Sequence, residues 1–142
     1  MTKKKILKYL ETTFEFHKLH YIAKKNEETM VELPNGSLMN VNKYICASDV
    51  FQAFIELEMF KNNFTGYKKY KLMRLYRIGY QTINSLSSIY NIKNIKDILN
   101  DYDIEFINLL LDFKYEYILY FLWDKKSIDY LIRFVKKYKI KD

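Results

Sequence analysis

The sequence is poor in the residues that break helices and form turns. Its 142 residues include only three glycines and one proline. This composition disfavours turn-rich β architectures and favours long helices. Three widely spaced glycines also cannot form a phosphate-binding loop. The length suits one domain and 49% of the residues are hydrophobic, so we expect a single folded domain over residues 1–142.

Cysteine and histidine are too few for most metal or nucleophilic sites. The single cysteine, Cys46, cannot form an internal disulfide, which fits a reducing, intracellular and cytoplasmic location. We expect it to be a small buried hydrophobe. His17 and His20 lie three positions apart, but there is no third histidine or second cysteine to complete a metal site. His17 falls in an apolar stripe and is expected to pack there, so we expect no metal, no cofactor and no enzymatic activity.

Long uninterrupted apolar runs are also missing. The most apolar stretch, Phe106 to Trp123, contains Asp112, Lys114 and Glu116. A membrane-spanning helix needs about 20 mostly apolar residues and rarely carries three charges. The basic N-terminus is followed by neither a long apolar run nor a small-residue cleavage site. We therefore expect neither a signal peptide nor a membrane partner.

Helical periodicity accounts for most of the chain, because apolar residues recur at steps of three and four. Helices are expected over about 3–24, 49–61, 67–90, 94–100, 101–123 and 127–140. Ser48 and Asp49 are predicted to cap the second of these, and Asp101 or Asp103 the fifth. The fifth is apolar around nearly its whole circumference up to Trp123, which predicts a place at the centre of a bundle.

Residues 29–42, TMVELPNGSLMNVN, do not follow the helical pattern. Pro34-Asn35-Gly36 is a strong turn signal because proline pre-sets φ while asparagine and glycine tolerate positive φ. Short apolar alternations flank it, so we expect a β-hairpin that packs on the helices. The expected fold class is mainly α, a single-domain helical bundle of about five to six helices with a small β-hairpin near residues 29–42.

Acidic residues are absent between Glu58 and Asp97. Residues 59–96 contain eight basic residues and no acid, a net charge of +8, whereas the whole chain carries +7. Residues 97–124 carry a net charge of −6 and residues 133–142 carry +4. Such segregation is typical of polyanion-binding proteins, because each lysine or arginine that meets a phosphate releases counterions.

A helical wheel divides residues 67–90 into two faces. The face predicted to point to the core holds Leu72, Leu75, Tyr76, Gly79, Ile83, Leu86 and Tyr90. The opposite face contains basic and amide side chains but no acid, whereas a solvated helix face usually mixes charges of both signs. Arginine, glutamine and asparagine also match the edges of purines. The residues predicted to contact nucleic acid are Lys68, Lys69, Lys71, Arg74, Arg77, Gln81, Asn84, Lys93, Lys96, Arg133, Lys136 and Lys137.

Three functions fit these features. The first is a small basic, non-enzymatic nucleic-acid-binding (DNA or RNA) or regulatory protein. It would contact phosphates through the exposed face of the 67–90 helix. The second is a protein-binding accessory factor or inhibitor from a phage, virus or mobile element, directed at an acidic protein surface. The abundance of Lys, Asn, Ile, Tyr and Phe, typical of an AT-rich bacterial or viral genome, fits this class. The third is a self-assembling structural protein, a homo-oligomer, because fourteen tyrosines exceed what one core needs to bury.

Overall fold

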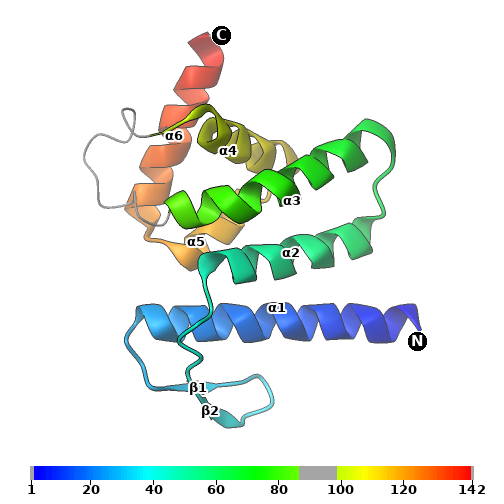
Figure 1. The fold of residues 1–142 in the computed structure, drawn as a ribbon, viewed down its shortest axis with the longest axis vertical. Helices are drawn as coiled ribbons and strands as arrows, with labels where there is room; N and C mark the ends of the chain where they lie inside the picture. The colour runs from blue at the N-terminus through cyan, green and yellow to red at the C-terminus, as the bar shows by residue number, and fades with distance from the viewer. Residues whose placement is uncertain (1, 87–98, 142) are drawn as a thin grey trace. The chain divides into compact units, whose positions relative to one another are not determined.

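The chain folds as a mainly α-helical protein (Figure 1). The computed structural model describes residues 2–86 and 99–141. Within these ranges lie six α-helices, one 3-10 turn and one antiparallel β-hairpin, so the predicted fold class is confirmed. The chain forms two compact units, Met1–Lys69 and Tyr70–Asp142. That residues 1–142 act as one domain stays a prediction.

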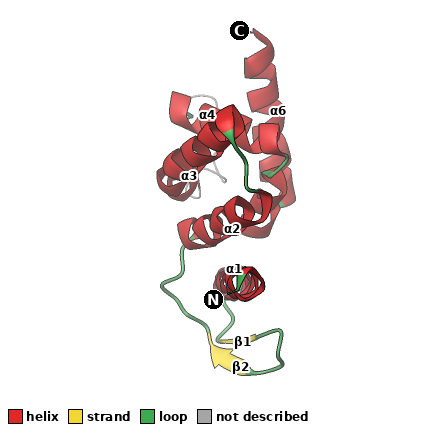
Figure 2. Ribbon diagram, turned by 90° about the vertical axis from the view of Figure 1, so that its right-hand side faces the viewer, coloured by secondary structure: helices red, strands yellow, loops and turns green. Residues whose placement is uncertain are grey.

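The first unit is built on two packed helices, α1 (Lys3–Lys25) and α2 (Ala47–Asn62). They lie side by side in both ribbon views (Figures 1 and 2). The ring of Phe14 on α1 meets the ring of Phe54 on α2 edge to face, with 5.7 Å between centroids. The predicted helix over 3–24 is therefore confirmed, and its apolar stripe supplies the contact with α2.

The predicted hairpin is present, with strands β1 (Met30–Glu32) and β2 (Leu38–Asn40) paired antiparallel. Gly36 adopts a φ of 87° in the turn, where only glycine avoids strain. The side-chain oxygen of Asn35 accepts a hydrogen bond of 3.0 Å from the Ser37 amide. Val31 is buried in a cluster with Ala23 of α1, so the hairpin packs on that helix as expected.

The start of α2 differs from the prediction. The helix begins at Ala47, and Cys46 is the N-cap residue. Asp49 lies one turn inside and its carboxylate accepts a 2.7 Å hydrogen bond from the Cys46 amide, while Ser48 is buried within the helix. Neither predicted residue is therefore the cap. Cys46 is exposed, so the expectation that it is buried is wrong, because the capping position holds it outside the packed faces.

The second unit contains most of α3 (Gly66–Leu86), whose buried face matches the predicted stripe. Leu72, Leu75, Gly79, Ile83 and Leu86 are buried as predicted, together with Ile78 and Thr82, while Tyr76 is half-buried. The predicted helical residues 87–90 and 94–98, Tyr90 among them, lie outside the described residues. The two that follow, Leu99 and Asn100, are not helical.

The predicted helix from residue 101 to Trp123 is wrong as one continuous element. It is divided into α4 (Asp101–Phe113), the 3-10 turn η2 (Glu116–Ile118) and the short helix α5 (Leu119–Leu122). The start is also capped differently, because Asn100 is the N-cap and Asp103 reaches back to the Asn100 amide at 2.9 Å. The predicted caps Asp101 and Asp103 are both inside the helix.

The break after α4 has a local cause in the backbone of Lys114. This residue adopts the left-handed conformation with φ 60°, and the Tyr115 amide donates a 2.8 Å hydrogen bond to the Leu110 carbonyl. That bond closes the helix in the manner of a helix C-cap, although the left-handed residue is a lysine rather than glycine. Tyr115 is buried and stacks on Phe113, with 5.4 Å between ring centroids.

The last helix, α6 (Lys125–Lys141), begins two residues before its predicted start. Asp124 precedes it and accepts a 2.9 Å hydrogen bond from the Ser127 hydroxyl. The predicted apolar face is confirmed, since Ile128, Leu131, Ile132 and Val135 are all buried. Helix α6 packs on α4 and α5, which leaves its opposite face to solvent.

Candidate functional site

Two cations of the predicted polyanion-binding face are paired with acids of α4. Lys71 lies 3.1 Å from a carboxylate oxygen of Asp112, and Arg74 donates to both oxygens of Glu105 at 2.8 and 2.9 Å. The hydrogen bond from Arg74 lowers the pKa of Glu105, and the same bond raises the pKa of Arg74. These two cations therefore neutralise acids within the chain.

The remaining predicted residues of α3 stay on its exposed side. Arg77, Gln81 and Asn84 are exposed, so of the basic residues in Tyr70–Leu86 only Arg77 is fully exposed. Lys68 and Lys69 are also exposed, in the first unit, with the ammonium of Lys68 4.5 Å from the ring centroid of Phe64. The two other predicted lysines of this segment, Lys93 and Lys96, lie outside the described residues.

Aromatic and apolar side chains occupy the rest of the exposed α3 face. Tyr70, Met73 and Tyr80 are 65%, 44% and 48% exposed, respectively. With Arg77 and Asn84 they form a line at alternating steps of three and four, which places them on one side of a helix. The exposed α3 face is thus richer in tyrosine and methionine than in charge.

Among the described residues of the second unit, helix α6 carries the densest exposed basic surface. Its sequence holds seven basic residues and one acid, Asp129. Arg133, Lys136 and Lys137, all predicted contact residues, are exposed. Lys126, Tyr130, Arg133 and Lys137 follow one another at steps of four, three and four and are exposed on one line, which we term the α6 stripe.

The side chains of the α6 stripe make no ion pair with any residue in the described ranges. The one acid of the helix lies beside the stripe and is engaged elsewhere. Asp129 accepts a 2.7 Å hydrogen bond from the Tyr120 hydroxyl and a 2.9 Å hydrogen bond from the Lys125 ammonium. The Asp129 carboxylate also interacts electrostatically with Arg133 of the stripe, although the two form no ion pair.

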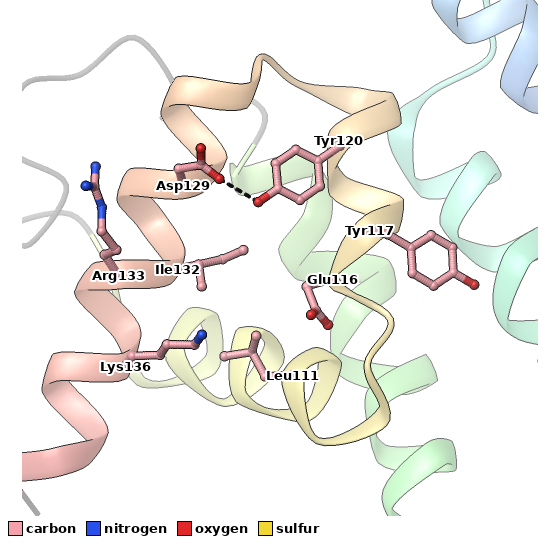
Figure 3. A pocket seen from close by; sticks show the side chains of 8 residues that line it. All are labelled: Leu111, Glu116, Tyr117, Tyr120, Asp129, Ile132, Arg133 and Lys136. Atoms are coloured by element: carbon pink, nitrogen blue, oxygen red, sulfur yellow. Dashed lines mark hydrogen bonds between the residues drawn. The ribbon is translucent and has the colours of Figure 1, made fainter.

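A surface pocket of about 520 Å³ opens next to the stripe, which we term the Tyr120 pocket (Figure 3). It lies between α6 and the chain from the end of α4 to α5. It is lined by Leu111, Glu116, Tyr117, Tyr120, Asp129, Ile132, Arg133 and Lys136. Lys136 extends toward it from α6 and Tyr120 covers one side, while Tyr117 points away.

Tyr120 is held in one orientation by its hydroxyl. The hydrogen bond to Asp129, followed by burial and the charge of that carboxylate, raises the pKa of Tyr120 to about 12. The same hydrogen bond, together with that from Lys125, lowers the pKa of Asp129. Tyr120 thus remains a neutral donor and Asp129 an ionised acceptor over the physiological pH range.

One polar atom of the Tyr120 pocket lacks a protein partner. The Oε2 atom of Glu116 is buried and accepts no hydrogen bond from the part of the chain that the structure describes. Buried carboxylate oxygens without donors are uncommon in folded proteins and are energetically costly.

A smaller pocket of about 360 Å³ lies between α3 and the start of α4. It brings together two predicted residues, Arg77 and Gln81, with Asn100 and Tyr102. Asp103 is buried beneath it, and burial raises the pKa of its carboxyl group. The Asp103 carboxylate accepts the capping hydrogen bond from the Asn100 amide. Because it is an acid, it makes this pocket unfavourable for a phosphate.

The described residues contain no group of three or more side chains suited to a metal ion. His20 is the fully buried histidine, while His17, predicted to pack in the apolar stripe, is only half-buried. No helix of the described ranges is long and apolar enough to cross a membrane.

Several residues of the α6 stripe and of the Tyr120 pocket were not among the residues predicted from the sequence. Lys126 and Tyr130 carry a detectable signal, because they share the three-and-four spacing of Arg133 and Lys137 on one helix. Glu116 and Tyr120 carry no such signal in the sequence. In the predicted continuous helix over residues 101–123, both would be ordinary surface residues of that helix. Only the reversal at Lys114 turns this segment toward α6.

Comparison of the chain with protein-family models, with curated proteins and with solved structures finds no match.

Proposed function

We propose that the protein is a small, non-enzymatic nucleic-acid-binding protein and that the α6 stripe contacts the phosphate backbone. The observation that carries the proposal is the line of Lys126, Tyr130, Arg133 and Lys137, exposed and without an acid among them. Three cations within four helical turns match a chain of regularly spaced phosphates, and their contact releases counterions. A tyrosine in the same line donates to phosphate or stacks on a base.

The contact surface of this proposal differs from the one expected from the sequence. Lys71 and Arg74 face Asp112 and Glu105, and a phosphate competes with those carboxylates. The α6 stripe forms no such ion pair among the described residues, and Asp129, whose charge also acts on Arg133, accepts its hydrogen bonds from Tyr120 and Lys125. The pairing of Lys71 and Arg74 therefore supports α6 over α3 as the principal phosphate-binding helix.

Charge reversal of the stripe tests the proposal. The triple variant Lys126→Glu, Arg133→Glu, Lys137→Glu is compared with Lys4→Glu, Lys8→Glu, Lys43→Glu, which changes the net charge equally at exposed positions of the first unit. Binding of a fluorescently labelled 12-nucleotide strand, and of its duplex, is measured by anisotropy at low salt. The stripe variant is expected to lose at least about 30-fold in affinity and the control variant less than about threefold. Equal losses would refute the proposal, because they would mean that only net charge matters.

A second function, binding of a protein partner, is supported by the exposed α3 face. Tyrosine, methionine and arginine are enriched at protein interfaces, and the line from Tyr70 to Asn84 has the spacing of a helix–helix contact. Arg77 lies at its midpoint, so two copies pairing in register would place like charges opposite each other. This favours an acidic partner over self-association. Sedimentation should give a monomeric mass for both the wild type and Arg77→Ala. If Arg77→Ala forms a dimer, the exposed α3 face pairs with itself.

A further inference from the structure

We propose that the nucleic acid held by the α6 stripe is single-stranded and that one unpaired base stacks on the ring of Tyr130. This inference rests on the proposed function, because phosphates bound by the stripe bring the base to the ring. The site makes no choice among the bases, since each of them has a π-face on which a tyrosine stacks.

Tyr130 lies within the row of cations rather than beside it. Lys126 precedes it by about one helical turn, and Arg133 follows it by about one turn on the same line. A strand whose phosphates meet these two cations therefore passes over the tyrosine.

The ring of Tyr130 is open to a ligand. The residue is 44% exposed, and its hydroxyl makes no hydrogen bond with any residue in the described ranges. The hydroxyl of Tyr120, in contrast, is engaged by Asp129. A tyrosine has only two side-chain torsions to fix, so it offers a large stacking area at a low cost in conformational entropy.

Over residues 126–137 the row of cations is one residue wide. On the side of the Tyr120 pocket it is bordered by Asp129 and Glu116 together with Lys136, so that side adds no net positive charge. On the other side lie Ser127 and Phe134, which are uncharged. A single strand presents one row of phosphates and a duplex presents two, so the charge pattern of α6 matches a single strand.

Helix α6 also has few side chains with which to read a duplex. Residues 125–141 contain neither asparagine nor glutamine, the amides that suit adenine in the major groove, and Arg133 is their one arginine. The bases of a duplex are stacked on one another, which closes their faces to a tyrosine ring. The ring of Tyr130 therefore stacks only on an unpaired base.

The test compares three labelled ligands by fluorescence anisotropy on the full-length protein at low salt. They are a 12-nucleotide thymidine strand, an abasic strand with the same number of phosphates, and a G·C-rich duplex of 12 base pairs. The thymidine strand is expected to bind at least about fivefold more tightly than the abasic strand, because only the former offers bases to stack. It should also bind more tightly than the duplex.

Three variants identify the part played by the ring. Tyr130→Ala should weaken binding of the thymidine strand by at least about fivefold and change binding of the abasic strand by less than about twofold. Tyr130→Phe keeps the ring without the hydroxyl, so it should bind the thymidine strand at least about threefold more tightly than Tyr130→Ala. Tyr9→Ala removes an exposed tyrosine of α1 in the first unit and is the matched control, with no change expected for either strand.

The outcomes separate this inference from the function on which it rests. Equal affinities for the thymidine and abasic strands would overturn base stacking and leave phosphate binding by α6 intact. Tighter binding of the duplex would overturn the single-stranded ligand, and a loss in Tyr130→Phe as large as in Tyr130→Ala would overturn stacking in favour of a hydroxyl–phosphate contact. Absence of binding to all three ligands would overturn the proposed function as well, and circular dichroism confirms that each variant is folded.

Discussion

Arg74 on α3 donates two parallel hydrogen bonds to the carboxylate of Glu105 on α4, at 2.8 and 2.9 Å. One turn away, Lys71 pairs with Asp112, and the order of the two pairs shows that α3 and α4 meet antiparallel. Residues 59–96 contain no acid in the sequence, but the folded chain places acids of α4 beside two of their cations. Among the described residues of the second unit, the positive charge that remains exposed lies mainly on α6.

Glu105→Gln should lower the melting temperature at low salt, because it removes one half of a bidentate ion pair between two helices. Both side chains are partly exposed, so the effect should be small and should largely vanish at about 1 M salt, where charges are screened. Thermal unfolding followed by circular dichroism at both salt concentrations measures it. Glu11→Gln, at an exposed position of α1, is the control. A variant as stable as wild type at low salt would show that the pair contributes nothing.

Asn100→Ala should destabilise the second unit by about 1 kcal/mol, the typical cost of removing an N-cap side chain. Asn100 accepts a 2.9 Å hydrogen bond from the Asp103 amide and its own amide donates to the Asp103 carboxylate. The free energy of unfolding in urea measures the loss. Gln81→Ala, on the exposed side of α3, should change this free energy by less than about 0.5 kcal/mol. Equal effects of the two substitutions would contradict the capping role.

How far the sequence predicts the fold depends on whether the determining contacts are local. The hairpin at Pro34-Asn35-Gly36 and the buried face of α3 follow from turn chemistry and periodicity, and both are present. The helix ends at Lys114, where the sequence has neither glycine nor proline to indicate a break. The left-handed conformation of Lys114 accompanies the burial of Tyr115, which is a tertiary contact. A local pattern alone therefore predicted one helix where there are three elements.

The candidate site was less predictable for the same reason. Arg133, Lys136 and Lys137 are recognisable as a basic run, and the structure leaves them exposed. The partners of Lys71 and Arg74 lie 41 and 31 positions further along the chain, and only the packing of two helices brings them together. The Tyr120 pocket likewise exists only because the chain reverses after α4.

The stability of the first unit should fall as the pH decreases through the titration of His20. Burial, and then the charge of His17, lowers the pKa of His20 below its ordinary value of 6.5. Its Nδ1 atom accepts a 2.8 Å hydrogen bond from the Asn42 amide, which requires the neutral ring. The unfolded chain thus binds the proton more readily, so the stabilisation is complete above about pH 6.5 and is lost as the pH falls toward the folded-state pKa.

His20→Asn should remove this pH dependence, because its side-chain oxygen still accepts from Asn42 but does not titrate. Urea unfolding of both proteins at a series of pH values between about 7 and 5 measures the difference. His17→Gln, at a half-buried position, should retain a decrease on acidification. A wild-type stability that is constant over this range would contradict the account of His20.

Gly36→Ala should destabilise the hairpin by about 1–2 kcal/mol through backbone strain alone. Gly36 has φ 87°, and beyond its two chain neighbours no atom lies within 4 Å of the position that a Cβ would occupy, so there is no clash to add to the strain. Gly36→Asn should cost less, since asparagine tolerates positive φ better than alanine. Urea unfolding ranks the three proteins, and an alanine variant as stable as wild type would rule out the strain.

The most direct test of the account is the salt dependence of nucleic-acid binding. The logarithm of the association constant for a labelled 12-nucleotide strand is plotted against the logarithm of the salt concentration, for wild type and for Lys126→Glu, Arg133→Glu, Lys137→Glu. If the α6 stripe holds three phosphates, the slope should be about two units shallower in the variant, since each single-strand phosphate contact contributes about 0.7. Equal slopes for the two proteins would show that phosphates do not bind at α6.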